Sequence, residues 1–214
     1  KAVPGTRAAL GVEHEKGKRT KPPAPFDLTT LQRRASKLWK WKAKHTLEIA
    51  QALYERHKAT TYPRSDCKYL TDDAAALVPT MAAKLTALPD FASLKGQKFA
   101  PGVWFNSKKV EGHDHDAIRP TETVPELDRL STDERKLYIL IARQYLASIL
   151  PDYIYDSTTV RFPAGGVQFE ARGTTPVSPG WKVAFGAGEK DEDEAEEGDD
   201  ALLPPLTDGE PGTA

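Results

Sequence analysis

Two residues in the run Thr61-Tyr62-Pro63-Arg64-Ser65-Asp66 have types and spacing that suit phosphoryl transfer. A phenol oxygen can attack phosphorus and form an ester that preserves the energy of the broken bond. A free phenol has a pKa of about 10, so a neighbouring group must help to remove its proton. Pro63 disfavours a helix through Tyr62. In the extended chain that results, side chains at i and i+2 share a face, so Arg64 would hold the phosphate beside the phenol.

The segments around this run carry helical patterns that would position it. Apolar spacing predicts helices at 29–39 and 44–57 before the run, with Asp27 or Thr29 as the first N-cap. A helical pattern resumes over 71–88, and Pro79 predicts that it forms two pieces. The tyrosine run therefore lies between helices, in a segment that is expected to be extended or a turn.

A longer helix and then a β-rich segment follow. Ser131 and Glu134 match a capping box that opens a helix running to about residue 150. Its buried stripe is expected to contain four residues, namely Ile139, Ala142, Leu146 and Ile149. Residues 91–130 are expected to be mostly loop, with short strands around 103–105. Antiparallel strands are expected at 153–162, 166–171 and 181–185, and the fold class is therefore α+β.

Composition excludes several classes of protein. The chain has 214 residues, and no stretch is apolar and long enough to be a transmembrane helix. The single cysteine, Cys67, excludes an internal disulfide and any zinc site built on two cysteines, and a reducing compartment is the default expectation. The net charge of −1 conceals an asymmetry, because residues 189–200 hold nine acids and one base. Residues 1–188 hold 29 bases and 20 acids, which favours a polyanionic partner.

Four motifs occur in one order along the chain: residues 22–32 (PPAPFDLTTLQ), 50–55 (AQALYE), 61–67 (TYPRSDC) and 115–121 (HDAIRPT). In this order they resemble the type IA DNA topoisomerases, and the Tyr-Pro-Arg form resembles the topoisomerase III branch. The resemblance extends from about residue 20 to residue 186, and residues 202–210 look like the family's entry to its next strand. Four ordered motifs make the resemblance specific.

The resemblance implies roles for individual residues. Tyr62 would be the nucleophile that cleaves one DNA strand and becomes joined to its 5′ phosphate, after which strand passage and resealing change DNA topology. Arg64 and His115 would hold the scissile phosphate. Together with the basic charge, the resemblance nominates further DNA contacts: Lys21, Arg33, Lys58, Thr61, Asp66, Lys68 and Arg119.

The resemblance also implies an organisation. Residues 1–27 would be a strand remnant and a basic, proline-rich connector, 28–150 a helical domain that carries the tyrosine, 151–187 strands of a hinge domain, and 188–214 an acidic linker. Members of the family bind Mg²⁺ through a Toprim domain, which we expect to be missing, so that this chain alone would be inactive. The partners would be single-stranded DNA and the remaining topoisomerase domains, without a membrane, in the cytoplasm beside the nucleoid. No Gly-x-x-x-x-Gly-Lys-Ser/Thr sequence is present, which indicates an ATP-independent reaction.

Two alternatives stay open on the sequence alone. In one, His113 and His115 bind a metal ion, as the histidine pair of a relaxase or rolling-circle nickase does, and Tyr62 remains the nucleophile. In the other, the chain is a non-catalytic module for single-stranded DNA, in which aromatic residues stack on bases beside lysine and arginine. The aromatic candidates for that role are Trp39, Trp41, Tyr69 and Trp104.

Overall fold

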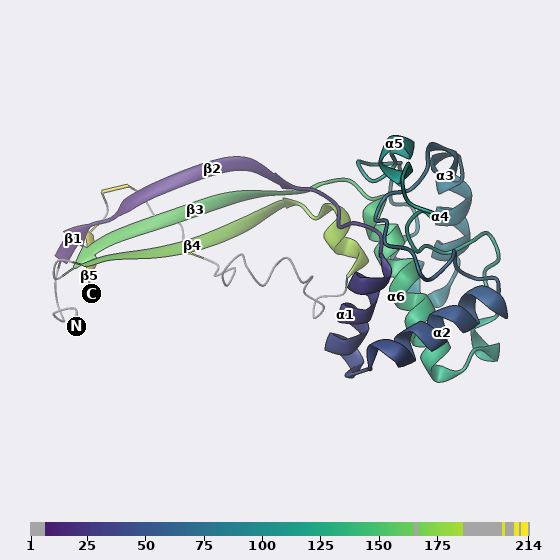
Figure 1. Cartoon of the computed structure of the whole chain (residues 1–214). Coiled ribbons are helices and arrows are strands. Elements are labelled where there is room, and N and C mark those ends of the chain that lie inside the picture. Colours follow the sequence, from purple (N-terminus) through teal and green to yellow (C-terminus); the bar gives the residue numbers. More distant parts are fainter. Residues whose placement is uncertain (1–6, 165–166, 186–202, 204–207, 210, 214) are drawn as a thin grey trace. The chain divides into compact units, whose positions relative to one another are not determined.

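Helices and strands form two separate units in the computed structural model, which describes residues 7–164, 167–185, 203, 208–209 and 211–213 (Figure 1). The strand unit draws its described residues from 1–21, 152–180 and 187–214. The helical unit consists of 22–151 together with 181–186. Helices and antiparallel strands occur in separate parts of the chain, so the α+β prediction is confirmed.

The strand unit contains a three-stranded antiparallel sheet in the order β2-β3-β4. Its strands are β2 (Gly11–Thr20), β3 (Tyr153–Ala164) and β4 (Val167–Ser178), while β1 (Arg7–Ala9) pairs with β5 (Pro211–Thr213). Figure 1 shows β2, β3 and β4 as long, gently curved strands. The strand expected at 166–171 is thus longer than predicted. The basic residues placed in a connector, up to Arg19, lie within β2 instead.

The strand expected at 181–185 is wrong, because these residues belong to a short 3-10 helix, Gly180–Ala184. Trp181 and Phe185 have high β propensity, yet the chain turns away from the sheet at Gly180, whose φ is +47°. A Cβ at this position would lie 2.2 Å from the carbonyl oxygen of Asp152, so only glycine fits. The Trp181 amide then donates to the carbonyl of Pro151 at 2.9 Å, and the Trp181 ring is buried.

The helical unit follows the predicted pattern of helices. Its α-helices are α1 (Leu28–Trp39), α2 (Ala43–Glu55), α3 (Asp72–Ala76), α4 (Val78–Thr86), α5 (Ser107–Val110) and α6 (Thr132–Ser148), with 3-10 helices at Pro89–Leu94 and Leu127–Arg129. The prediction of short strands around 103–105 is wrong. Among the described residues, Phe105 makes only an isolated bridge to Leu70, and α5 begins two residues later. Here Asn106 caps α5 and ends the extended segment.

Helix α6 lies in the middle of the helical unit, with α1 and α2 towards one end and α3, α4 and α5 towards the other (Figure 1). The predicted capping box is present: Ser131 Oγ accepts from the Glu134 amide, and Glu134 Oε2 accepts from the Ser131 amide at 2.8 Å. Nearly all side chains from residue 140 onward are buried, on every side of the helix. The expected stripe is confirmed except at Ile139, which is only half-buried.

The start of α6 is tied to the end of α2 through one buried carboxylate. Glu134 is 6% exposed, and its Oε1 accepts from Arg56 Nη2 at 2.7 Å and lies 3.2 Å from His57 Nε2. Burial raises the pKa of Glu134, but the hydrogen bonds from Ser131 and His57 outweigh it and leave that pKa below its ordinary value. This carboxylate therefore caps α6 and holds its start against the end of α2.

No helix among the described residues has the length and apolar character needed to cross a membrane.

Candidate active site

The tyrosine run has a turn at Pro63 and Arg64, and its side chains alternate between two distinct faces. Along residues 62–68, Pro63, Ser65 and Cys67 are buried, whereas Arg64, Asp66 and Lys68 are exposed and Tyr62 is half-buried. Because Pro63 and Arg64 form a turn, this alternation does not come from a regular strand. Tyr62 and Arg64 nevertheless line the same pocket. The amide of Leu28 at the start of α1 fixes the segment by donating to the Ser65 carbonyl at 2.9 Å.

A second segment, residues 115–121, runs beside the tyrosine run and is hydrogen-bonded to it. The Thr61 amide donates to the Arg119 carbonyl at 2.9 Å, and the Arg119 amide donates to Thr61 Oγ1 at 3.0 Å. Thr61 Oγ1 also donates to the Ala117 carbonyl at 3.0 Å. Ser65 Oγ donates to the His115 carbonyl at 3.2 Å. These bonds bring His115 beside a tyrosine that lies 53 positions earlier in the sequence.

An open pocket of about 420 Å³ lies where the two segments meet. Its lining residues are Tyr62, Arg64, Ser65, Asp66, Gly112, His113, Asp114 and His115. The rings of Tyr62 and His115 lie 4.3 Å apart between centroids, and Tyr54 on α2 packs edge-on against Tyr62 at 5.4 Å. Tyr62 is thus held between a helix and the second segment, with one side open to the pocket.

The charges around the pocket are of both signs. The Arg64 and His115 side chains are exposed at the pocket, where they can meet an anion. Asp66 Oδ1 lies 2.7 Å from His113 Nδ1, and this hydrogen bond lowers the pKa of the Asp66 carboxyl. The carboxylate is therefore already partnered, which limits its repulsion of a phosphate in the pocket.

Just behind the pocket, Asp116 and Arg119 form a largely buried pair, 3.4 Å apart and 17% and 15% exposed. Burial raises the pKa of Asp116, and the charge of Arg119 opposes that rise. Because the Arg119 guanidinium is occupied by Asp116 and by the Pro120 carbonyl, it supports the second segment. A direct contact of Arg119 with DNA stays a prediction.

The other predicted DNA contacts lie outside the pocket lining. Lys58 and Lys68 flank the tyrosine run, where Lys58 Nζ lies over the Tyr54 ring and Lys68 Nζ lies 3.8 Å from Asp27. Arg33 is exposed on α1. Lys21 belongs to the strand unit and pairs with Asp152 at 2.9 Å. The pocket therefore unites four of the predicted residues, Tyr62, Arg64, Asp66 and His115.

Four pocket residues have no role in phosphate binding that the sequence alone suggests: Ser65, Gly112, His113 and Asp114. The sequence suggests His113 only as a metal ligand. Its hydrogen bond with Asp66 could not be predicted, because the two residues are 47 positions apart in the sequence. Within the part of the chain that the structure describes, no group of three or more His, Cys, Asp or Glu side chains could hold a metal ion. The thiol of Cys67 is buried, which raises its pKa, so it is not positioned as a nucleophile.

Comparison with known proteins gives consistent matches. A family model described as DNA topoisomerase matches residues 6–213. The DNA topoisomerase 3 of Bacillus subtilis (strain 168) is 39% identical over 217 residues, covering 98% of this chain and 29% of that protein. The DNA topoisomerase 3 of Bacillus licheniformis is 38% identical over 214 residues, with the same coverage of both chains. The chain thus spans under a third of the length of these relatives.

A solved structure supports the fold. The full-length topoisomerase I from Thermotoga maritima aligns with a TM-score of 0.68 at 22% sequence identity, covering 97% of this chain and 32% of that one. At this identity the likeness concerns the fold alone.

Proposed function

This chain belongs to the type IA DNA topoisomerase family, and from that premise we propose that it carries the strand-cleaving site of such an enzyme. The observation that carries the proposal is the pocket in which Tyr62, Arg64 and His115 meet. A phenol, a guanidinium and an imidazole around one open pocket are suited to a phosphodiester of a DNA strand.

In the proposed reaction the Tyr62 hydroxyl oxygen attacks the phosphorus of a phosphodiester. The bond between phosphorus and the 3′ oxygen breaks, so the 5′ phosphate becomes joined to Tyr62 and the 3′ oxygen leaves. The phenol gives up its proton, and the leaving oxygen takes up a proton to become a 3′ hydroxyl. In the reverse step this hydroxyl attacks the phosphotyrosine and releases Tyr62. Because the ester preserves the bond energy, resealing needs no nucleotide.

Arg64 is proposed to bind the non-bridging oxygens of that phosphate. A guanidinium presents several N–H donors in a fixed plane, which match two phosphate oxygens at once. Its side chain is exposed at the pocket and shares a face with Tyr62, so it can reach the same phosphorus centre. Stabilisation of the developing charge at such a position typically contributes about 10²–10³ in rate.

His115 is proposed to complete the phosphate site. Its ring packs against that of Tyr62 at a tilt of 43°, and the Ser65 hydroxyl fixes its backbone. The contact between the rings orients the phenol, and a ring nitrogen of the imidazole can meet the phosphate from the pocket side. His115 therefore acts both on the position of the nucleophile and on the charge of its target.

We propose single-stranded DNA as the substrate and Mg²⁺ as the cofactor of the complete enzyme. The described residues do not fit a metal site, since they include no group of three or more metal-ligating side chains. No step above depends on the ion. The relaxase alternative is not favoured, because the family match points elsewhere and His113 pairs with Asp66.

A covalent-adduct assay tests the proposal in a chimera, in which this chain replaces the matching segment of the Bacillus subtilis relative. Single-stranded oligonucleotides labelled at either end are incubated with the chimera and then denatured. We expect protein-linked label only from the 3′-labelled strand, because the 5′ phosphate of the downstream piece carries the tyrosine. Tyr62→Phe should abolish the adduct, while Tyr54→Phe, which changes a neighbouring ring outside the pocket lining, should retain it. An adduct in Tyr62→Phe, or one that carries the 5′ label, would overturn the proposal.

A further inference from the structure

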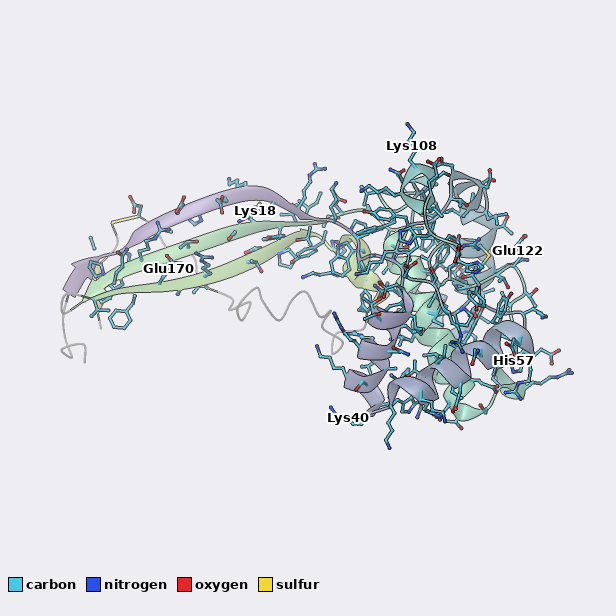
Figure 2. All side chains as sticks on the ribbon, viewed as in Figure 1. Lys18, Lys40, His57, Lys108, Glu122 and Glu170 are labelled. Atoms are coloured by element: carbon cyan, nitrogen blue, oxygen red, sulfur yellow. The ribbon has the colours of Figure 1, made fainter. Side chains whose placement is uncertain are left out.

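A second cluster of basic and aromatic side chains lies at the turn between α1 and α2. Residues 28–47 contain six lysines and arginines and no acidic residue. Three of these bases alternate with two tryptophans and an alanine in the sequence of residues 39–44, WKWKAK, which we call the basic–aromatic turn. Figure 2 shows Lys40 at this turn, at the end of the helical unit. The pocket around Tyr62 includes none of these residues.

The two tryptophan rings of the turn form a small platform. Trp39 and Trp41 lie 4.6 Å apart between centroids, and His45 packs edge-on against Trp41 at 4.8 Å. Lys40 ends α1 in the left-handed conformation, with φ of 59°, which brings the two rings together. His45 Nε2 lies 2.8 Å from Asp133 Oδ2 at the start of α6, so the platform is anchored to the core helix.

These rings are not core residues. Trp39 and Trp41 are each half-buried, whereas Trp181 of the same unit is 3% exposed. Leu38 beside them is 38% exposed. By contrast, Tyr69 and Trp104 are engaged with one another and with Lys109 and the Pro22 carbonyl. Tyr69 and Trp104 are half-buried as well, but Lys109 Nζ already lies over the Tyr69 ring at 4.5 Å from its centroid, so we take the pair in the turn as the candidate for stacking.

The lysines of the turn face solvent with little compensating negative charge. Lys40, Lys42 and Lys44 are all exposed. Lys44 lies 3.8 Å from Glu48, and both side chains of this pair are more than half exposed, so its strength is small. A strand of phosphates could displace this weak pair and release counterions.

We propose that the basic–aromatic turn is a second binding surface for single-stranded DNA, distinct from the tyrosine pocket. A base stacks on the face of Trp41 or Trp39, and Lys40, Lys42 and Lys44 contact the neighbouring phosphates. The inference rests on the proposed function only in taking a DNA strand as the ligand. A single strand fits better than a duplex, because base faces are open to stacking only when they are unpaired.

The surface and the pocket lie at opposite ends of α2. Tyr54, near the end of α2, contacts Tyr62, whereas α2 begins at Ala43 immediately after the turn. Eleven residues at about 1.5 Å each separate these points by roughly 16 Å. Substitutions in the turn therefore change no atom of the pocket, and the two sites can be tested independently.

The experiment uses the 214-residue chain and an oligothymidylate of about 12 nucleotides, within the range of about 4–16 that single-strand modules bind. Intrinsic emission comes from four tryptophans, so the part that Trp41→Phe removes reports contact with the turn. Anisotropy of a labelled oligonucleotide reports affinity. We expect saturable quenching that Trp41→Phe largely removes with little change in affinity. Trp41→Ala should weaken binding about tenfold, because the stacking ring is gone. Thermal unfolding of each variant shows that it is folded, and the conservative Phe variant keeps the test valid if the Ala variant is not.

Charge variants give a second, matched readout. Lys40→Gln with Lys42→Gln should reduce the slope of log affinity against log salt by about 1.4, because each neutralised phosphate of a single strand contributes about 0.7 to that slope. Lys95→Gln with Lys98→Gln removes two exposed lysines elsewhere in the helical unit and should leave the slope unchanged. Arg64→Ala should leave quenching at Trp41 intact, even if cleavage in the chimera fails.

Four results would overturn the inference. The first is that oligothymidylate fails to quench the emission of Trp41, and the second is that both lysine pairs change the slope equally. The third is that inorganic polyphosphate quenches the emission as strongly, which would mean attraction without stacking. The fourth is that the emission responds to removal of residues 189–200 and not to DNA, which would identify the acidic run of this chain as the occupant.

Discussion

The rings of Tyr62 and His115 pack at 4.3 Å between centroids with their planes tilted by 43°. Neither ring could hold the other in place alone, because both lie in segments without regular secondary structure. Their contact is fixed by hydrogen bonds of Thr61 and Ser65 to the neighbouring segment. The nucleophile of the proposed reaction is thus positioned by a pair of loops bonded to each other and seated on α1 and α2.

Arg64 should contribute to cleavage far more than to binding. In the chimera, Arg64→Ala is expected to slow formation of the covalent adduct by about 10²–10³, because a donor to the developing charge is removed. Arg64→Lys keeps the charge but not the planar fork, so it should retain binding and recover only part of the rate. Arg129→Ala, which removes an exposed arginine outside the pocket lining, serves as the control and should leave the rate unchanged. An Arg64→Ala chimera that cleaves at the normal rate would remove Arg64 from the mechanism.

Ser65 should matter for the position of His115. Its hydroxyl donates to the His115 carbonyl and accepts from the Cys67 amide at 3.1 Å, and the side chain is buried. Ser65→Ala leaves these groups unpaired, so the free energy of unfolding should fall by about 1–3 kcal/mol in chemical denaturation. Cleavage should fall while the affinity for single-stranded DNA stays within about threefold, a change of about 0.65 kcal/mol. Equal losses of both would show that the serine acts only on stability.

The Asp66 carboxyl should titrate below its ordinary value of 3.8, because His113 hydrogen-bonds to its ionised form. Carboxyl-carbon NMR of the 214-residue chain measures this directly. Replacing the partner by His113→Ala should raise the pKa of Asp66 towards 3.8. His115→Ala provides the comparison, since that ring contacts Tyr62, and it should leave Asp66 low. If His113→Ala has no effect on Asp66, the pair does not form in solution.

Glu134 should make stability depend on pH in the acid range. Its pKa in the folded chain is lowered from 4.5, so its contribution is fully present above that pH and is lost as the pH falls through the lowered value. Glu134→Gln keeps the capping geometry but loses the charge towards Arg56 and His57, and should cost about 1.5–3 kcal/mol at pH 7. The difference from the unaltered chain should vanish at strongly acidic pH.

The exposed pair of Arg129 and Glu126 supplies the control for that experiment, because both side chains are at least 70% exposed. Glu126→Gln should change the free energy of unfolding by less than about 0.5 kcal/mol at any pH. A pH-independent effect of Glu134→Gln would mean that packing, and not charge, explains the loss.

Tyr138 should tolerate loss of its hydroxyl. The side chain is fully buried on α6, its hydroxyl finds no hydrogen-bond partner among the described residues, and burial raises its pKa. Tyr138→Phe should therefore raise the free energy of unfolding by about 1 kcal/mol, because an unpaired polar group leaves the core. Tyr69→Phe removes a hydroxyl that accepts from Lys109 and should give no such gain. A clear loss of stability in Tyr138→Phe would indicate that the hydroxyl is hydrogen-bonded in solution.

Local patterns predicted much of this fold, and the failures share a cause. Ser131 and Glu134 predicted the start of α6, because a capping box is a pattern of only four consecutive residues. Trp181 to Phe185 resembled a strand, but contacts of Gly180 with Asp152 and of Trp181 with Pro151 imposed a 3-10 helix. The β propensity of a short segment cannot predict such contacts, because they depend on residues far away in the sequence.

The site divides in the same way. The absence of a helix through Tyr62 was predictable because Pro63 restricts the residue before it, and the family motif supplied His115. The partner of Asp66 was not predictable, since His113 lies 47 positions away and pairs with it only in the folded chain. Likewise, nothing near Arg119 in the sequence indicates that its guanidinium is turned inward to Asp116.

The alternation along residues 62–68 limits how this segment can change in length. Insertion or deletion of a single residue after Tyr62 would exchange the two faces, placing the guanidinium of Arg64 in the core and Ser65 in solvent. Replacing an exposed side chain alters one contact, whereas a change of one position in spacing inverts all of them. The segment therefore tolerates substitution of its exposed side chains but not the insertion or deletion of a residue.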